Sequence, residues 1–452
     1  MIFFSLLLYP VQAKVRGVVK DSAGEPLPGA NVAWVNTKIF TVTAEDGSFS
    51  VDKPKDSETL VISYIGFEND TIHVDSENVK LEIVLREGLS LGEVNVVRRR
   101  FGTTKLRSSA MNVDIISSAE LSRAACCNLG ESFVTNPSVD VSYSDAATGA
   151  KQIKLLGLSG TYVQMMTENI PNYRGAAAPY GLGYVPGPWM QSIQVSKGSS
   201  SVKNGYESIT GQINVEFKKP QLPEADWVSA NLFASSTGRY EANADATLKL
   251  SKRWSTSLLA HYENETMAHD ANHDGFADIP RVEQYNLWNR WAYMGDHYVF
   301  QAGIKALSEW RNSGQVNHGG NPGQEFYKIG IDTRRYEAFT KNAYIFNKEK
   351  NTNLALILQG TFHNQDAVYG HKLYDVDQTN VYASLLFETE FSKRHSLSTG
   401  LSFNYDGYDQ RYRLTNDVEL PRLKSFEKES VPGAYVQYTY NLEDKLILMG
   451  GI

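Results

Sequence analysis

Residues 193–215 read IQVSKGSSSVKNGYESITGQINV. Alternating and β-branched residues at Ile193–Val195 and at Gly211–Phe217 predict a β-strand at each end of this stretch. Serine and glycine residues fill much of the connection between them, where neither helical nor strand periodicity is present. The middle of the chain is therefore predicted to contain a strand, a turn-rich connection and a second strand.

The segment before this stretch mixes a helix, strands and a long loop. Apolar residues recur at every fourth position after a serine cap and predict a helix over Ser117–Phe133: Leu121, Ala125, Leu129 and Phe133. Lys151–Leu156 and Val163–Met166 are predicted strands. Between Pro171 and Pro188 the sequence is rich in Gly, Ala, Pro and Tyr, which predicts a long loop of the kind that carries function.

Three pieces of residues 101–219 resemble the plug domain of TonB-dependent outer-membrane transporters. They are Asn136–Val141 (NPSVDV), Gln164–Pro171 (QMMTENIP) and the opening stretch, which matches the family pattern I-E-V-x-K-G-x-x-S-x-x-x-G-x-x-x-x-x-G-x-I-N-V. One departure is notable, because the family's I-x-I-R-G motif reads IKLLG at Ile153–Gly157, without arginine. The resemblance implies an α+β plug domain over residues 101–219.

The resemblance also gives a role to residues 88–100, a linker between two domains. Leu91–Val97 (LGEVNVV) is similar to a TonB box, and the residues proposed for the box are Glu93, Val94, Asn95, Val96 and Val97. Such a segment would add a strand to its energy-transducing partner through backbone hydrogen bonds. The alternative is a plain edge strand that ends in the basic residues Arg98–Arg100.

Residues 14–87 are predicted to form a small antiparallel β-sandwich. About seven short runs alternate or are β-branched, and turn residues separate them. The order VxGxVxDxxGxPLPGANV, then TxxDGSF, then LVISYIGF resembles the carboxypeptidase regulatory-like domain, which implies no peptidase activity. Residues 1–13 form an apolar run that ends in a small residue, as a secretory signal peptide does, although the positively charged start of such a peptide is missing. A buried first strand is the alternative.

Residues 220–452 change character. Eleven predicted strands of about ten residues alternate apolar and polar faces, and this half of the chain holds 33 of the 51 aromatic residues. Some connections are tight, such as Ser251–Arg253, and others are long and polar: Asn264–Glu283, Ser308–Arg335 and Asp409–Val431. Short turns at one end and long loops at the other are typical of a transmembrane β-barrel, although a soluble β-repeat protein is an alternative.

The expected fold is therefore mainly β, with an N-terminal β-sandwich, an α+β plug and the first half of a 22-stranded transmembrane β-barrel. Barrels with a plugged lumen have about 22 strands, and half a barrel would leave an open edge in lipid. We accordingly expect residues 220–452 to be a partial barrel and the sequence to be a fragment.

One loop of this half has the spacing of a calcium site. Residues 270–278 read DANHDGFAD, which places oxygen ligands at the first, third, fifth, seventh and ninth positions. The predicted ligands are Asp270, Asn272, Asp274, Phe276 (through its carbonyl) and Asp278. Arg281 stands where an EF-hand has glutamate, so an EF-hand is excluded. The alternative is an Asx-rich turn without metal.

Cys126 and Cys127, the two cysteines of the chain, are adjacent within the predicted helix. They could bind a soft metal, and Met165, Met166 and Met190 are further soft ligands near them in the sequence. Adjacent residues of a helix point about 100° apart, however, which makes it awkward for both thiolates to reach one ion. The alternative is that the two cysteines are ordinary small buried residues. Eight of the nine histidines lie in the barrel segment, where solvated loop histidines are the commoner interpretation. No arrangement of catalytic residues is found, and no enzyme is predicted.

The resemblance implies an active transporter in the outer membrane of a Gram-negative bacterium, surrounded by lipid, with its N-terminal domain and plug on the periplasmic side. The expected partners are the TonB-ExbB-ExbD complex and a small metal-chelate ligand: a siderophore, cobalamin, haem or a copper complex. A net charge of −7 without a basic block argues against nucleic acid. The alternatives are a glycan or peptide importer paired with a lipoprotein, and a calcium-binding adhesin.

The predicted ligand contacts lie in the loop before the opening stretch. They are Tyr173, Arg174, Tyr180, Tyr184 and Trp189. The alternative for this loop is that it packs against the barrel wall.

Overall fold

A computed structural model describes residues 14–21, 24–35, 37, 39–44, 46–54, 57–64, 70–74, 80–85, 103–105, 112–124, 127–134, 136–158, 160–198, 201–205, 207–221, 227–316, 326–442 and 446–452. The predicted signal (residues 1–13) and the predicted TonB box (Glu93–Val97) lie outside these residues. The chain divides into two compact units, residues 1–100 and residues 101–452.

The first unit holds two small sheets around a core that includes Trp34, Leu60 and Ile62. One sheet has the order β4-β1-β7, from Ser48–Asp52, Lys14–Lys20 and Lys80–Val84. The other has the order β3-β2-β5-β6, from Phe40–Val42, Asn31–Trp34, Thr59–Ser63 and Asp70–His73. The predicted sandwich is present, but the expectation that it is wholly antiparallel is wrong, because β1 and β7 pair in parallel.

The plug forms the first part of the second unit and is built on a six-stranded sheet of order β13-β12-β15-β14-β9-β8. Its strands are Ile170–Pro171, Val163–Thr167, Gly211–Phe217, Met190–Lys197, Asn112–Ser117 and Thr103–Lys105. The two strands of the opening stretch, β14 and β15, are antiparallel neighbours at its centre. A separate hairpin joins β10 (Val139–Asp145) to β11 (Ala150–Leu155). Single 3-10 turns occupy the connections: η1 (Leu129–Glu131), η2 (Gly160–Tyr162), η3 (Gly175–Ala177), η4 (Gly187–Trp189) and η5 (Val202–Asn204).

The predicted helix over residues 117–133 is much shorter in the structure. The α-helix α1 spans Ser118–Arg123, and a 3-10 turn, η1, spans Leu129–Glu131. Leu129 donates its amide to the carbonyl of Val185, and Cys127 accepts from the amide of Gly187. Residues 127–129 thus bond to the loop before β14 instead of continuing the helix, although Leu129 is buried as the spacing predicts.

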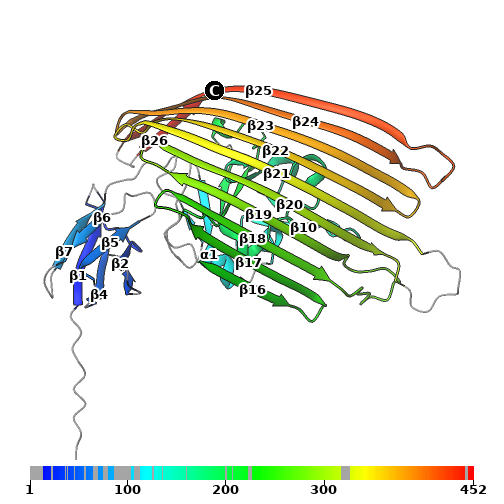
Figure 1. Cartoon of the computed structure of the whole chain (residues 1–452), viewed down its shortest axis with the longest axis horizontal. Helices are drawn as coiled ribbons and strands as arrows, with labels where there is room; N and C mark the ends of the chain where they lie inside the picture. Colours follow the sequence, from blue (N-terminus) through cyan, green and yellow to red (C-terminus); the bar gives the residue numbers. More distant parts are fainter. Residues whose placement is uncertain are drawn as a thin grey trace, which may run out of the picture. The chain divides into compact units, whose positions relative to one another are not determined.

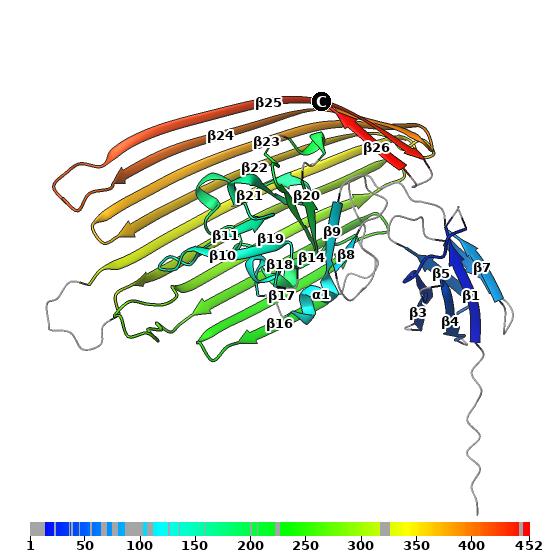
Figure 2. The same cartoon turned by 180° about the vertical axis from the view of Figure 1, so that it is seen from behind.

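The third part of the chain is one antiparallel sheet of eleven strands in chain order, as the sequence predicts. The strands are β16 (Val228–Ala234), β17 (Arg239–Lys249), β18 (Trp254–Glu265), β19 (Arg281–Met294), β20 (Tyr298–Gly314), β21 (Lys328–Asn347), β22 (Thr352–Tyr369), β23 (Lys372–Ser392), β24 (His395–Arg413), β25 (Leu423–Leu442) and β26 (Leu446–Gly451). The sheet curves around the plug (Figures 1 and 2).

Two of the predicted long loops are wrong for most of their length. Residues 308–335 and 409–431 are largely strand, because β20, β21, β24 and β25 continue past the apolar part of the sheet. The extensions pair residue by residue, for example Glu309 with Thr333 and Asp409 with Phe426. Their polar sequences lack the apolar alternation on which the prediction relied.

The two faces of this sheet differ as those of a membrane barrel do. Exposed apolar side chains such as Leu258, Leu287 and Ile304 cover the outer face. Two aromatic pairs on β18 and β19 bound this apolar zone: Trp254 with Tyr293, and Tyr262 with Tyr285. Eight residues separate the two pairs on each strand, which is a distance of about 27 Å along the strand. If the strands tilt by about 40° from the membrane normal, this distance spans about 20 Å of membrane thickness. That height is near the apolar band of outer-membrane barrels.

None of the described helices is long and apolar enough to cross a membrane.

Candidate functional site

The candidate site is the contact between the plug and the inner face of the sheet, which we call the plug–wall interface. Polar and charged residues at alternate positions of β17–β24 face the plug and are buried, among them Arg290, Lys305 and Glu309. Period-two alternation places them on one face. Figure 2 shows the plug strands lying within the curve of the sheet. Buried charge of this kind must be paired, so the pairs define how the plug is held.

The aromatic residues predicted to contact ligand lie in this interface. Tyr173, Tyr180, Tyr184 and Trp189 are each no more than 6% exposed. The hydroxyl of Tyr173 accepts a hydrogen bond from Lys305 Nζ at 3.1 Å, and Trp189 packs on Trp288 with ring centroids 6.2 Å apart. The structure therefore places these side chains in packing against the wall, the alternative left open above. Ligand contact by them stays a prediction.

Arg174, the fifth predicted residue, joins the plug loop to strand β24. Its guanidinium lies 2.6 Å from Glu207 of the plug and 3.5 Å from the buried Asp406. Burial raises the pKa of the Glu207 carboxyl, and Arg174 partly opposes that effect. Gly175 follows with φ +58°, and a Cβ there would collide with the Tyr408 hydroxyl and the Gln378 amide. This close approach requires glycine.

Sequence reasoning missed Glu168, which makes the most buried ion pair between plug and wall. Its carboxylate lies 2.6 Å from Arg290 of β19 and 3.6 Å from Lys341 of β21, and Lys341 also donates to the Glu168 carbonyl at 2.8 Å. The Glu168 and Arg290 side chains are 3% and 2% exposed. We call Glu168, Arg290 and Lys341 the latch.

The latch is built on a strained turn. Glu168 and Asn169 have φ of 52° and 62° and connect β12 to β13 as a two-residue hairpin turn. Asparagine adopts this left-handed conformation readily, whereas glutamate does not. The signal that could have found Glu168 is its place in QMMTENIP, one of the three pieces of the sequence that resemble a plug domain.

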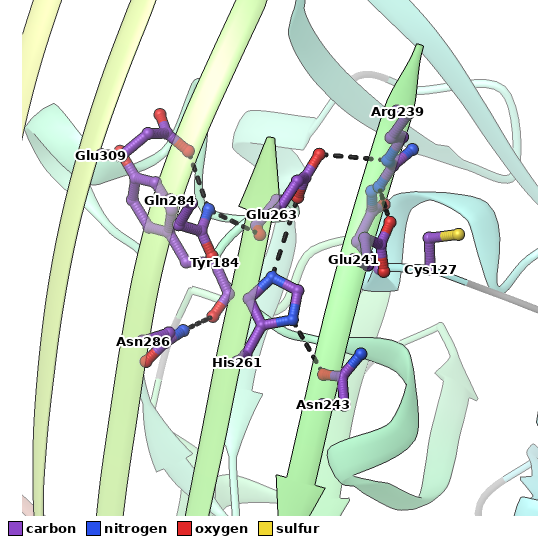
Figure 3. A network of polar contacts seen from close by, with 12 residues as sticks. Cys127, Tyr184, Arg239, Glu241, Asn243, His261, Glu263, Gln284, Asn286 and Glu309 are labelled. Atoms are coloured by element: carbon purple, nitrogen blue, oxygen red, sulfur yellow. Dashed lines mark hydrogen bonds and ion pairs between the residues drawn. The ribbon is translucent and has the colours of Figure 1, made fainter. Parts of the chain in front are cut away.

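A second cluster surrounds Arg239 of β17 (Figure 3). Its guanidinium lies 2.8 Å from Glu131 of the plug, 2.7 Å from Glu241 and 3.1 Å from Glu263. Burial alone would raise the pKa of the Glu131 carboxyl, but Arg239 and Lys151 outweigh it and lower that pKa. One wall arginine thus neutralises carboxylates from both sides of the interface.

Cys127 lies beside Glu241 in this cluster (Figure 3). Burial raises the pKa of its thiol, so the thiolate form that binds soft metals is disfavoured. Cys126 lies outside the described residues. Within the described part of the chain, no group of three or more His, Cys, Asp or Glu residues is placed to hold a metal ion. Soft-metal binding by Cys126 and Cys127 stays a prediction.

The predicted calcium loop connects β18 to β19. Its carboxylates accept hydrogen bonds from the loop's own amides: Asp270 from Asp274 and Gly275, and Asp278 from Ala271 at 2.7 Å. His273 takes a left-handed φ of 58°. These contacts describe a closed Asx-rich turn, and calcium binding stays a prediction.

Two family models match parts of the chain. A family model described as the CarboxypepD_reg-like domain matches residues 15–96, and one described as the TonB-dependent receptor plug domain matches residues 105–212.

Two curated relatives are TonB-dependent receptors. SusC of Bacteroides thetaiotaomicron is 27% identical over 256 residues, which are 53% of this chain and 25% of SusC. P39 of Formosa agariphila is 37% identical over 112 residues, which are 25% of this chain and 10% of P39. The aligned part thus spans a quarter or less of these relatives' length. Both relatives are named as receptors and not as enzymes.

Solved structures share the fold. The ferripyoverdine receptor of the Pseudomonas aeruginosa outer membrane has a TM-score of 0.62 at 14% identity, covering 81% of this chain and 56% of the receptor. The ferric-catecholate import receptor Fiu of E. coli has a TM-score of 0.57 at 15% identity, covering 76% of this chain and 59% of Fiu. The predicted outer-membrane location agrees with these comparisons. The chain therefore carries a carboxypeptidase regulatory-like domain and a TonB-dependent receptor plug domain, and it is homologous to the TonB-dependent receptors.

Proposed function

We propose that the protein imports a scarce ligand across the outer membrane, driven by TonB. The observation that carries this proposal is the plug–wall interface. The plug is a matched family domain, and charged groups tie it to the polar inner face of a sheet whose outer face is apolar. These ion pairs and hydrogen bonds can be broken and remade, and they stand beside an apolar contact in which Trp189 and Phe217 of the plug pack on Trp288 of the wall.

The proposed mechanism has three steps. External loops and the outward side of the plug capture the ligand, binding releases the TonB box at Glu93–Val97 to the periplasm, and TonB-ExbB-ExbD uses the inner-membrane proton gradient to move the plug. Movement requires that Glu168 separate from Arg290 and that Glu131 separate from Arg239, because both pairs join plug to wall.

Two ligand classes are proposed. The metal chelate, which the sequence favoured, rests on the resemblance alone, since a chelate brings its own metal and needs no ligating residues from the protein. The glycan or peptide alternative rests on the resemblance as well. A calcium-binding adhesin without transport is the rival from another class.

The experiment replaces residues 93–97 of the full-length protein with five glycine and serine residues, which keeps the length of the linker. Cells that carry this variant should lose ligand accumulation while still binding ligand at the surface. The control is the same replacement at residues 347–351, the short turn that joins β21 to β22 at the opposite end of the wall from the long loops. Unchanged accumulation, together with loss of cell adhesion when the loop Asp270–Asp278 is deleted, would support the adhesin instead.

A further inference from the structure

Two short turns of the wall share the sequence Ser-Lys-Arg, and we call them the SKR turns. Residues 251–253 join β17 to β18, and residues 392–394 join β23 to β24. Because the strands of the wall follow one another in antiparallel order, both turns lie at the same end of the sheet. This is the end of the short turns, which in outer-membrane barrels faces the periplasm.

The two SKR turns have the same local structure. Ser251 Oγ accepts a hydrogen bond from the Arg253 amide at 3.2 Å, and Ser392 Oγ accepts one from the Arg394 amide at 3.3 Å. The carbonyl of each arginine accepts an amide from the following strand, at 2.8 Å from β19 and at 2.9 Å from β25. The backbone of each turn is therefore held in place, while the lysine and the arginine side chains of both turns are exposed.

Apolar and aromatic side chains flank each pair of cations. Leu250 precedes the first SKR turn and is 56% exposed, and Phe391 precedes the second and is 62% exposed. A ring follows each turn, Trp254 in the first and His395 in the second, and each packs on a tyrosine of the next strand with ring centroids 5.1 Å apart. Trp254 belongs to an aromatic pair that bounds the apolar zone of the outer face, so the cations stand at the edge of that zone.

This position corresponds to the layer of the lipid head groups. Arg253 is one residue away from Trp254, which is about 3.4 Å along the strand, or about 2.6 Å of height at a tilt of about 40°. The head-group layer is about 5–8 Å thick on each side of the hydrocarbon core. Long lysine and arginine side chains can therefore place their charge among the phosphates while their carbon stems cover apolar surface.

The charge of the SKR turns is available to an anion. Arg253 lies 2.9 Å from Asp296, but both side chains of this pair are more than half exposed, and such a pair contributes little. The turn between β21 and β22 differs, because Glu349 stands between its two lysines. The loops at the opposite end of the wall carry mainly carboxylates: Asp270, Asp274, Asp278, Asp417 and Glu419.

An anionic phospholipid fits this arrangement better than an acidic protein does. The planar guanidinium binds phosphate through two parallel hydrogen bonds, and the neighbouring lysine adds a second charge. An acidic protein would also meet these cations, but it would not meet the flanking apolar side chains, which face the hydrocarbon. The two SKR turns are six strand spacings apart, about 29 Å, so each would bind a lipid of its own.

We propose that each SKR turn binds the head group of one anionic phospholipid, such as phosphatidylglycerol, in the periplasmic leaflet of the outer membrane. The Lys–Arg pair binds the phosphate, and the flanking apolar and aromatic side chains contact the acyl chains. Two such contacts fix the height and the tilt of the wall in the membrane. The proposal goes beyond ligand import and does not depend on it.

The test measures lipid binding to the purified full-length protein in a neutral detergent by native mass spectrometry. The probes are phosphatidylglycerol and phosphatidylethanolamine with the same acyl chains, with inorganic phosphate as a competitor. A basic residue near an anionic lipid surface changes affinity about fivefold, so a Lys–Arg pair should bind phosphatidylglycerol at least about tenfold more tightly than phosphatidylethanolamine. The wild type should retain two molecules of phosphatidylglycerol.

The test variant removes the four cations of the SKR turns: Lys252→Gln, Arg253→Gln, Lys393→Gln and Arg394→Gln. Its affinity for phosphatidylglycerol should fall to that for phosphatidylethanolamine, and a variant of either turn alone should retain one molecule instead of two. The matched control removes four exposed lysines at the loop end of the wall: Lys328→Gln, Lys372→Gln, Lys424→Gln and Lys428→Gln. This control changes the net charge equally and should bind phosphatidylglycerol as the wild type does. Heat-modifiable migration in a gel checks that all variants are folded.

Three outcomes would overturn the proposal. Equal affinity of the wild type for the two lipids would exclude selection of an anionic head group and point to an acidic protein as the partner of the turns. Equal losses in the test variant and the control would show that net charge, and not the SKR turns, attracts the lipid. Displacement of phosphatidylglycerol by inorganic phosphate at the concentration of the lipid would make free phosphate the ligand.

Discussion

Breaking the latch should loosen the plug far more than breaking a surface ion pair of similar length. The perturbation is Glu168→Gln, which keeps the shape of the side chain and removes its charge. Arg290 and Lys341, both facing Glu168, would then lack their counter-charge in a buried site.

The magnitude follows from the burial of the pair. Removing one partner of a buried ion pair costs about 3–5 kcal/mol, and a neutral hydrogen bond from Arg290 to the new amide returns about 1 kcal/mol. We therefore expect the free energy of opening the turn to fall by about 3 kcal/mol, which is about a 150-fold change in its opening constant. The exposed pair Arg253–Asp296 is the control, at 2.9 Å. Asp296→Asn should cost at most about 1 kcal/mol of stability at its own exposed site and leave the opening constant of the turn at Glu168 unchanged.

Native-state hydrogen exchange measures this opening directly. The amide of Asn169 donates to Asn214 Oδ1 at 2.7 Å, and the amide of Asn172 donates to the Met165 carbonyl at 3.0 Å. Both amides are protected only while the turn is closed. In Glu168→Gln they should exchange about 150-fold faster, and in Asp296→Asn they should exchange as in the wild type.

A double-variant cycle makes the test specific to the pair. Arg290→Gln should accelerate exchange of the same amides. In the variant that combines it with Glu168→Gln, the free energy of opening the turn should fall by less than the sum of the two single decreases. Acceleration below about fivefold in Glu168→Gln, or strict additivity in the cycle, would refute the idea that this ion pair holds the turn.

Three further predictions concern other parts of the interface and its rim. With the other cysteine replaced by serine, Cys127 should be labelled by maleimide far more slowly than an exposed cysteine at about pH 8, because burial raises its thiol pKa and keeps the reactive thiolate scarce; labelling at the rate of an exposed thiol in the folded protein would contradict this. Gly149→Ala should destabilise the hairpin tip by about 1–2 kcal/mol, since φ is +67° and the new Cβ would lie 2.8 Å from Pro280 Cγ. Gly360→Ala, where no atom lies within 4 Å, is its control, and equal melting temperatures of the two variants would be evidence against the close approach. If the loop at Asp270 binds calcium, added Ca²⁺ should raise the melting temperature of the wild type but not of Asp270→Asn, and a chelator should reverse the shift; no calcium response in the wild type would leave the loop an Asx-rich turn.

The sequence predicted the strands well wherever one face is apolar. Alternation located all eleven strands of the wall, and the spacing of Leu129 and Phe133 identified buried positions in the plug. It failed for the polar extensions of β20–β25, since hydrogen bonding to a neighbouring strand stabilises them without any apolar face. It also failed after α1, where long-range bonds to Val185 and Gly187 override the helical spacing.

The candidate site was only partly predictable. Loop composition pointed to Tyr173–Trp189, but composition cannot tell a side chain that packs on the wall from one that faces a ligand. Glu168, Arg239 and Arg290 matter because of the partners that the fold brings to them, from positions more than 100 residues apart. Inward-facing charges in alternating strands are a signal that could have singled out the two arginines.

We propose that the plug–wall interface opens under energy from TonB to admit a ligand. Accumulation of a ligand that the purified protein binds, measured with and without a protonophore in cells that carry the full-length protein, tests this opening. We predict that ligand still binds at the cell surface when the proton gradient collapses, and that accumulation stops. Accumulation at an unchanged rate without the gradient would contradict the claim.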